Sequence, residues 1–298
     1  MNIAVYEVGP RDGLQSIESF IQTPVKQKLV AALYRAGLEN VEEVSFAHPK
    51  LVPQMADAED VYDRGAALVM NKRGFDRAVA AGVDKFNIVF SPCETFNINN
   101  MNKTRSEIVL MYKTFMRNVP KDKVRVYISM AFGSPHSGTP RLATLISCIR
   151  DAKMFGDTVV FADTVGVATR RDMEHVAQLA KNEGVRPALH LHHNGNEGRA
   201  MELVRHAIFH GIHEIDSSIG GLGGCPFAAN SGANLSTETL VASLHAWGFE
   251  TGVDEAALSE ASRIAEQIKL KEIGHGKEAW AGETWLDSCL PSASRPAV

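Results

Sequence analysis

Apolar residues follow two alternating patterns along the chain. Short runs rich in β-branched residues recur, and most of them precede a segment in which apolar residues repeat every three or four positions. Short apolar runs are typical of buried strands, whereas the longer repeat is typical of helices. The alternation predicts βα units around a parallel sheet. Eight strands are expected, the third with the weakest pattern, over residues 3–8, 40–46, 67–70, 85–90, 124–130, 158–163, 188–192 and 213–218.

The predicted helices carry an apolar stripe. The first begins with Thr23 and Pro24, a capping residue followed by a first-turn proline, and Gly37 ends it. Eight alternating units without a long linker favour an α/β fold of the (β/α)8 TIM-barrel type over a doubly wound sheet. An extra C-terminal helix is expected to pack on the barrel. The later helices are expected near residues 104–118, 139–155, 170–184, 197–211, 234–247 and 255–271.

Chain length limits the number of domains, and the cysteine pattern limits the kinds of metal or disulfide site. A chain of 298 residues allows one or two domains, because α/β barrels of about 250 residues form a single domain. We expect one catalytic barrel domain over residues 1–290, including the C-terminal helix, and a disordered Pro- and Ser-rich tail over residues 291–298. The four cysteines form no C-x-x-C pair, which argues against a zinc ribbon or a disulfide framework.

Charge and hydropathy argue against two classes of partner. The formal net charge of -4 disfavours a nucleic-acid groove built on bulk positive charge. No apolar run approaches the roughly 18 to 20 residues of a membrane span, and the first residues enter a predicted strand without a targeting segment. We therefore expect a cytoplasmic protein that binds neither nucleic acid nor membrane.

Two histidines in the seventh predicted strand are the first candidates for chemistry. His190 and His192 alternate with leucines, so the two imidazoles share one face, with their Cα atoms about 6.6 Å apart. If the leucines face the helices, both histidines face the barrel interior, where a metal ion would satisfy both. A single buried histidine is more often only hydrogen-bonded, but the pair favours a metal site.

The turn after the first predicted strand adds a carboxylate. Arg11 and Asp12 lie side by side at the end of the barrel where active sites form, although such a pair is often merely an ion pair. Strands seven, eight and one are neighbours in a closed barrel, so Asp12 can meet His190 and His192 despite their separation in sequence. One carboxylate and two imidazoles would form half of the ligand shell of a divalent cation.

A glycine-rich segment follows the eighth predicted strand. Residues 220–227 read G-G-L-G-G-C-P-F, which lacks the glycine order of a dinucleotide fingerprint or a P-loop. Glycines give mobility and allow close backbone approach, so we interpret the segment as an active-site lid. Cys225 within it is either a reactive or an inert thiol. Glu42 and Asp163, on predicted strands two and six, are either active-site carboxylates or hydrogen-bonding residues of the barrel.

Longer motifs surround these residues, and together with residues 220–227 they extend from about Val5 to Val253. They are G-P-R-D-G-L-Q at 9–15, V-E-E-V-S-F at 41–46, H-P-K-L-V-P-Q-M-A-D at 48–57, A-D-T-V-G at 162–166, H-L-H at 190–192 and N-L-S-T-E at 234–238. In these motifs the sequence resembles the 3-hydroxy-3-methylglutaryl-CoA (HMG-CoA) lyase family. That family belongs to a wider group of metal-dependent barrel enzymes that make or break carbon-carbon bonds by Claisen-type chemistry.

The resemblance implies a metal site and its ligands. The positions that match the family's metal ligands are Asp12, His190, His192 and Asn234. A set that mixes imidazoles with oxygen donors suits Mg²⁺ or Mn²⁺, and no organic cofactor is expected.

The resemblance also implies catalytic roles. Arg11 corresponds to the residue that stabilises the enolate, and Glu42 and Asp163 correspond to active-site carboxylates. His190 or Asp163 is the candidate proton acceptor. Cys225 corresponds to the lid cysteine and is the candidate to protonate the enolate.

The implied activity is metal-dependent retro-Claisen cleavage of a 3-hydroxyacyl-CoA thioester. In the parent case HMG-CoA yields acetyl-CoA and acetoacetate, a reaction of leucine degradation and ketone-body formation. The implied partners are therefore an acyl-CoA substrate and, because barrels of this family commonly pair, a second copy of the chain in a homodimer.

Three loops depart from the family pattern. Gln15 is followed by Ser16 where the family has Asn, His136 stands where it has Tyr, and His193 stands where it has Asp. With Arg11, these residues are the predicted contacts to the substrate. Their changes leave open a lyase for another 3-hydroxyacyl-CoA, beside two further alternatives: a Claisen-condensing acyltransferase of the same barrel group, and a catalytically idle acyl-CoA-binding scaffold.

Overall fold

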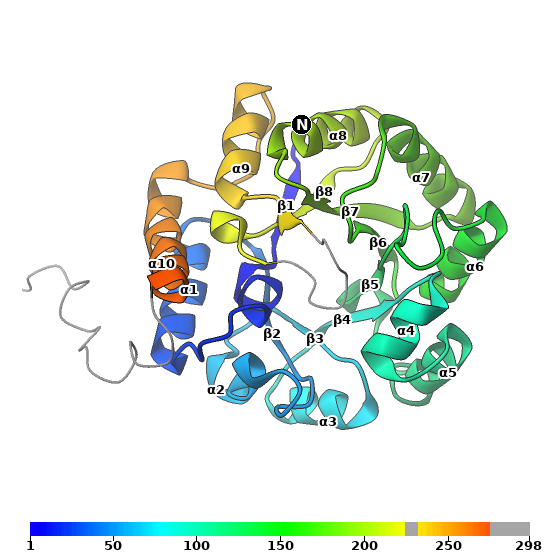
Figure 1. The fold of residues 1–298 in the computed structure, drawn as a ribbon, viewed down its shortest axis with the longest axis horizontal. Helices are drawn as coiled ribbons and strands as arrows, with labels where there is room; N and C mark the ends of the chain where they lie inside the picture. Colours follow the sequence, from blue (N-terminus) through cyan, green and yellow to red (C-terminus); the bar gives the residue numbers. More distant parts are fainter. Residues whose placement is uncertain (224–231, 275–298) are drawn as a thin grey trace, which may run out of the picture.

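Eight parallel strands form a closed barrel in the computed structural model, which describes residues 1–223 and 232–274 (Figure 1). The strands are β1 (Ala4–Glu7), β2 (Asn40–Ser45), β3 (Ala66–Leu68), β4 (Lys85–Phe90), β5 (Val124–Ile128), β6 (Thr158–Asp163), β7 (Arg186–His193) and β8 (Glu214–Ser217). They pair in the order β6-β5-β4-β3-β2-β1-β8-β7, and β6 pairs with β7 to close the ring. The TIM-barrel prediction is confirmed.

All eight predicted strands are present, including the weakest. The β3 strand has three residues, yet it pairs with β2 on one side and β4 on the other. The first strand lies beside the last, because Ala4 to Glu7 pair in register with Glu214 to Ser217 of β8. The turn that follows β1 therefore lies next to the ends of β7 and β8.

Helices surround the barrel, and their apolar sides pack on the outward faces of the strands (Figure 1). They are α1 (Thr23–Arg35), α2 (Ala58–Val61), α3 (Lys72–Ala80), α4 (Glu94–Met101), α5 (Arg105–Phe115), α6 (Leu142–Lys153), α7 (Arg170–Glu183), α8 (Glu197–Phe209), α9 (Thr237–Ala246) and α10 (Glu255–Gly274). Helices α2, α3 and α4 were not expected from the sequence. Helix α3 buries only Gly74 and Ala78, so its apolar stripe is too thin to be recognised from the pattern.

The extra C-terminal helix, α10, packs against α1. The two helices are joined at their exposed edge by an ion pair of 2.8 Å between Arg35 and Glu260. Gly37, which ends the turn after α1, has φ +89°, and a Cβ there would lie 2.4 Å from the carbonyl oxygen of Gly252. The chain crosses itself here at a distance that only glycine permits.

The ends of two predictions lie outside the described residues. They are the part of the predicted barrel domain after residue 274 and the tail over residues 291–298. Among the residues that the structure describes, no helix combines the length and the apolarity needed to cross a membrane.

Alternation along the strands separates two buried environments. On β7, Leu189 and Leu191 belong to the core between barrel and helices. His190 and His192 are also buried, but they point to the opposite side and line a cavity inside the barrel mouth. The predicted orientation of the two histidines is confirmed.

Candidate active site

A cavity of about 500 Å³ opens at the carboxyl ends of the strands, where the active sites of barrel enzymes form. Its polar wall includes Arg11, Asp12, His190 and His192. The remainder of the lining is largely apolar and includes Leu68, Val89, Phe96, Met111 and Ala162. An apolar pocket with a few converging polar groups is the usual form of a small-molecule site.

The turn Gly9–Gly13 places Arg11 and Asp12 at this wall. It is one tight helical turn whose N–H groups at Arg11, Asp12 and Gly13 all point to the carbonyl oxygen of Val8. The buried carboxylate of Glu7 holds the turn from behind by accepting the N–H of Gly9 at 2.7 Å. These hydrogen bonds fix the turn that carries both functional side chains.

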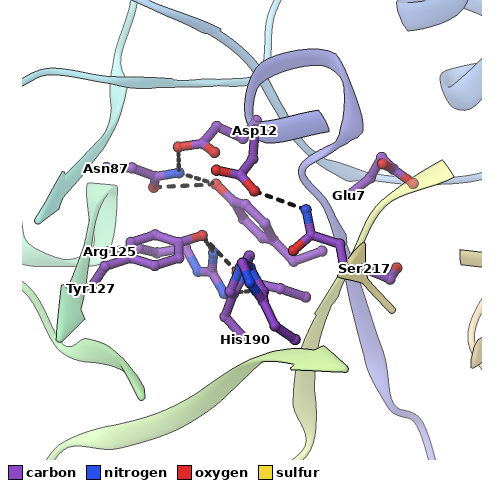
Figure 2. Close-up of polar contacts among 12 residues, drawn as sticks. Glu7, Asp12, Asn87, Arg125, Tyr127, His190 and Ser217 are labelled. Atoms are coloured by element: carbon purple, nitrogen blue, oxygen red, sulfur yellow. Dashed lines mark hydrogen bonds and ion pairs between the residues drawn. The ribbon is translucent and has the colours of Figure 1, made fainter. Parts of the chain in front are cut away.

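Asp12, His190 and His192 converge, as the strand order predicts, and Figure 2 shows Asp12 and His190 inside the barrel. One potential ligand atom of each lies within 4.8 Å of those of the other two. The Nε2 atoms of the two histidines are 3.0 Å apart. Two imidazole nitrogens and a carboxylate oxygen therefore share one small volume inside the barrel mouth.

A short strand adds Asn234 to the cluster. Strand β9 (Ala233–Asn234) pairs antiparallel with the end of β7 and sets Asn234 opposite His192. The Asn234 amide nitrogen donates to Asp12 Oδ2 at 2.8 Å and to the carbonyl oxygen of Leu222 at 3.0 Å. Its Oδ1 atom is buried and accepts no hydrogen bond from the described residues. A buried unpaired amide oxygen is costly unless a cation or water satisfies it.

The donor set fits a divalent cation. It offers oxygens from Asp12 and Asn234 and nitrogens from His190 and His192, a mixture that suits Mg²⁺ or Mn²⁺ and also Zn²⁺ or Fe²⁺. The orphaned Asn234 oxygen is the observation that favours a cation here over a cluster satisfied by its own hydrogen bonds.

The protonation states of Asp12 and His192 also suit a cation. Burial alone would raise the pKa of Asp12, but the Arg11 guanidinium and His190 lower it to about 2. Burial alone would lower the pKa of His190, but Asp216 and Asp12 raise it. Burial and the neighbouring His190 lower the pKa of His192 to about 3, which keeps that ring neutral. An ionised carboxylate and a neutral imidazole are the forms that bind metal.

Arg11 is held on the opposite side by Glu42. Its Nε atom donates to Glu42 Oε2 at 2.5 Å, and its Nη1 atom donates to Asp12 Oδ1 at 2.7 Å. Glu42 also accepts 2.7 Å from the amide of Asn87 across the barrel interior. Burial raises the pKa of Glu42, although Arg11 opposes the shift. Arg11, Asp12 and Glu42 thus form one connected group.

Three residues that were not expected from the sequence support His190 on the Nδ1 side of its ring. Asp216 of β8 lies 3.2 Å from His190 Nδ1 and also accepts hydrogen bonds from Arg125 and Tyr127. A signal for Asp216 was present, since it lies between Ile215 and Ser217 on a strand whose alternate residues face inwards. No sequence signal marked Arg125 and Tyr127, because their contact with Asp216 of β8 spans the barrel.

Asp163 is not brought into this cluster. The register pairs it with Leu191, on the outward side of the sheet, while its neighbour Ala162 pairs with His190. Its two oxygens accept the N–H groups of Val167 and Ala168 at 2.9 and 2.8 Å. The motif placed Asp163 correctly at a strand end, but the strand turns its side chain towards its own loop.

The predicted substrate contacts divide into two groups. Gln15 lines the cavity together with Arg11. Ser16 and His136 are exposed, and neither they nor His193 belong to its lining. Cys225 lies outside the described residues.

The sequence matches the protein-family model described as HMGL-like over residues 2–265. The mitochondrial hydroxymethylglutaryl-CoA lyase of Rattus norvegicus is 36% identical over 270 residues, which cover 87% of this chain and 83% of that protein. The cytoplasmic 3-hydroxy-3-methylglutaryl-CoA lyase of Danio rerio is 34% identical over 270 residues, with 87% and 81% covered.

Solved structures agree with this match. The HMG-CoA lyase of Bacillus subtilis superposes with a TM-score of 0.82 at 34% identity, covering 90% of this chain and 94% of that one. An HMG-CoA lyase of Acinetobacter baumannii, solved with coenzyme A and 3-methylmalate, gives 0.82 at 30% identity and covers 97% and 98%. The family model, the similar sequences and these structures together establish that this chain belongs to the HMGL-like family.

Proposed function

We propose that this protein is a carbon-carbon lyase that cleaves HMG-CoA to acetyl-CoA and acetoacetate with the help of a divalent cation. The observation that carries the proposal is the convergence of Asp12, His190, His192 and the unpaired Asn234 oxygen beside Arg11, in one cavity. Membership of a family that includes HMG-CoA lyases supports the reaction type, and the donor atoms of the cluster support the cation.

The reaction breaks the bond between C2 and C3 of the acyl group. The proton of the C3 hydroxyl passes to a base, the C3–O bond becomes a carbonyl, and the electron pair of the C2–C3 bond moves into the thioester as an enolate. A proton then adds to C2 to give acetyl-CoA. When bound, the cation supplies Lewis acidity that lowers the pKa of the hydroxyl and fixes its orientation.

The chain's own residues supply the remaining parts. Arg11 lines the cavity with its guanidinium fixed by Asp12 and Glu42, as stabilisation of a developing enolate requires. Of the two candidate bases, His190 presents Nε2 to the cavity, whereas both Asp163 oxygens are bonded to their own loop. General-base help of this kind is typically worth roughly 10²- to 10⁴-fold. His190 Nε2 is also a proposed ligand, and one lone pair cannot bind the cation and a proton at the same time, so neither residue is assigned as the base.

The position of the changed loops favours HMG-CoA over another acyl group. Ser16, His136 and His193 carry the departures from the family pattern, and all three lie outside the cavity lining. The cavity walls near Arg11 and His190 are formed by other residues, so those departures do not alter the contacts that an acyl group would make. The coenzyme A bound to the Acinetobacter baumannii relative supports an acyl-CoA ligand.

An assay of acetyl-CoA release tests the proposal. Purified protein is incubated with HMG-CoA and, separately, with other 3-hydroxyacyl-CoA thioesters, with Mg²⁺ or Mn²⁺ present. We expect preferential cleavage of HMG-CoA, loss of activity to background on chelation and recovery when the cation is restored. Unchanged activity in chelator would reject the cation, and preference for another thioester would reject the substrate. Tight acyl-CoA binding without product would favour the scaffold alternative.

Two further expectations belong to the same proposal. Mg²⁺ and Mn²⁺ are the cations that the mixed oxygen and nitrogen donors favour in a cell. A homodimer in the cytoplasm is the expected form of the enzyme, and size measurement in solution tests that oligomeric state.

A further inference from the structure

We propose that Asp216, braced by Arg125 and Tyr127, is a positioning residue that fixes the tautomer of His190, so that the Nε2 lone pair faces the cation site. This inference rests on the cation of the proposed function. It concerns three residues that no sequence motif marks and that are not among the proposed ligands of the cation.

Asp216 is buried, and both of its carboxylate oxygens have hydrogen-bonding partners. Asp216 pairs in register with His190 on the neighbouring strand, so both side chains point into the barrel. Its Oδ2 atom lies 3.2 Å from His190 Nδ1 and accepts 2.8 Å from the Tyr127 hydroxyl, while its Oδ1 atom accepts 2.7 Å from Arg125. A carboxylate can only accept, so the hydrogen shared with His190 must lie on Nδ1.

The tautomer decides what His190 offers to the cavity. With the proton on Nδ1, Nε2 carries a lone pair and lies 3.0 Å from His192 Nε2, inside the proposed cation site. With the proton on Nε2, the same atom would point a hydrogen at the cation. The outer partner of a ligating histidine therefore determines whether the ring can ligate at all.

Arg125 cannot easily move to another arrangement. Its guanidinium carbon lies 3.4 Å from the centroid of the Tyr6 ring, and its Nε atom is 2.7 Å from a carboxylate oxygen of Glu214. Arg125 and Asp216 are both buried, so removal of one partner leaves a costly unpaired charge. The fixed guanidinium of Arg125 orients Asp216, and Asp216 in turn orients His190.

Because of these contacts, Asp216→Asn is expected to do more than remove a negative charge. The amide oxygen would turn towards the fixed donors of Arg125, which leaves the amide NH₂ facing His190. An amide donor at that place bonds an unprotonated Nδ1 and so moves the ring proton to Nε2. The variant keeps the shape of Asp216 but reverses the tautomer that ligation needs.

The experiment measures two quantities, the Mn²⁺ affinity of the protein and the tautomer of His190. Mn²⁺ is titrated into the metal-free protein and free Mn²⁺ is followed by electron paramagnetic resonance. We expect Asp216→Asn to weaken binding by about 10- to 100-fold, the usual cost of losing an outer partner of a ligand. Long-range ¹H–¹⁵N spectra of the metal-free protein, at a pH where the rings are neutral, should show His190 protonated on Nδ1 in the wild type and on Nε2 in the variant. His190→Gln assigns the resonance.

Glu43→Gln is the matched control. Glu43 is a fully buried strand carboxylate like Asp216, but it faces the helices and bonds the backbone of residues 63–65. Glu43→Gln should leave the Mn²⁺ affinity within about twofold of wild type, even where the substitution lowers the unfolding free energy. An equal loss of affinity in Glu43→Gln would mean that Asp216 acts only through general stability and would overturn the proposal.

The wild-type spectrum keeps the test decisive if Asp216→Asn fails to fold. An Nε2-protonated His190 in the metal-free wild type would overturn the inference without any variant. The outcome is also separable from the proposed function. A wild type that binds Mn²⁺ with the expected tautomer but does not cleave HMG-CoA would reject the lyase proposal and leave the role of Asp216 intact.

Discussion

Glu42 and Glu43 are adjacent in the chain and fully buried, yet they belong to two different regions of the molecule. Glu42 points into the barrel, where it bonds Arg11 and Asn87. Glu43 points towards the helices, where it accepts the Tyr34 hydroxyl and the N–H of Gly65. One carboxylate is connected to the reactive groups, and the other holds a loop.

The difference teaches that the face of a strand, and not burial, assigns chemistry in this fold. The same rule separates His190 from Leu191 on β7 and Ala162 from Asp163 on β6. Interior side chains meet residues from across the ring, whereas outward carboxylates find backbone N–H groups of nearby turns.

The largest effect is expected at the interior ligands. His192→Ala removes a neutral imidazole from the cation volume, so metal affinity and turnover should fall together, by more than the roughly 10- to 100-fold expected for an outer partner. Asp12→Asn should behave in the same way. Calorimetric titration of metal and the acetyl-CoA assay give the two values.

The outward face of the same strand supplies the control. Leu191→Met changes a buried residue that is 1% exposed and lies next to His192, but on the helix side. A swap of similar volume should cost less than about 1.5 kcal/mol of unfolding free energy and leave metal affinity unchanged. If Leu191→Met lost metal as His192→Ala does, the two faces would not be independent.

The next largest effect is expected at Glu42. Glu42→Gln removes the charge that fixes the Arg11 guanidinium, so kcat should fall by roughly 10²-fold, the scale of one lost stabilising group. Glu43→Gln should cost about 1–3 kcal/mol in unfolding free energy but leave kcat nearly normal. Similar kcat values for the two variants would contradict the comparison.

The strand pattern predicted the fold well because most strands, even the three residues of β3, carry a buried apolar run. The cluster of Asp12 with His190 and His192 followed from strand order alone. Asp216 escaped notice because its value depends on Arg125, which reaches it from β5 across the barrel. Such contacts depend on side-chain lengths across the ring, which a periodic pattern does not encode.

Asp163 shows the opposite failure. Its motif marked the right strand end, but one residue of alternation decides the face, and the register places it opposite Leu191. Ser16 and His136 differ from the family pattern at exposed positions, so a change of sequence near the mouth did not mean a change in the cavity lining. Helix α3 was missed because a short helix with two buried small residues gives little signal.

The smallest effect on turnover is expected at Glu7, a third buried carboxylate, which joins the two regions. Glu7 lies on the outer side of β1 and accepts the N–H groups of Gly9 and Ile219 and the hydroxyl of Thr237, so it ties the turn of Arg11 to α9. Burial raises its pKa from 4.5 to about 7, although these hydrogen bonds oppose the shift. Glu7 is therefore a brace whose protonation changes near neutral pH.

The sign of the resulting pH dependence follows from the raised pKa. The folded state holds the Glu7 proton more tightly than the unfolded chain, so the stabilising contribution is complete below about pH 4.5 and is lost as the pH rises through about 7. At about 1.4 kcal/mol for each pKa unit, the total change is on the order of 3 kcal/mol. Glu7→Gln cannot titrate. The unfolding free energy of the wild type minus that of Glu7→Gln, from urea titrations, should therefore decrease between pH 4.5 and 7.5. The subtraction cancels every other titrating group, so a difference that stayed flat or grew with pH would show that Glu7 is ionised in the fold and would contradict the prediction.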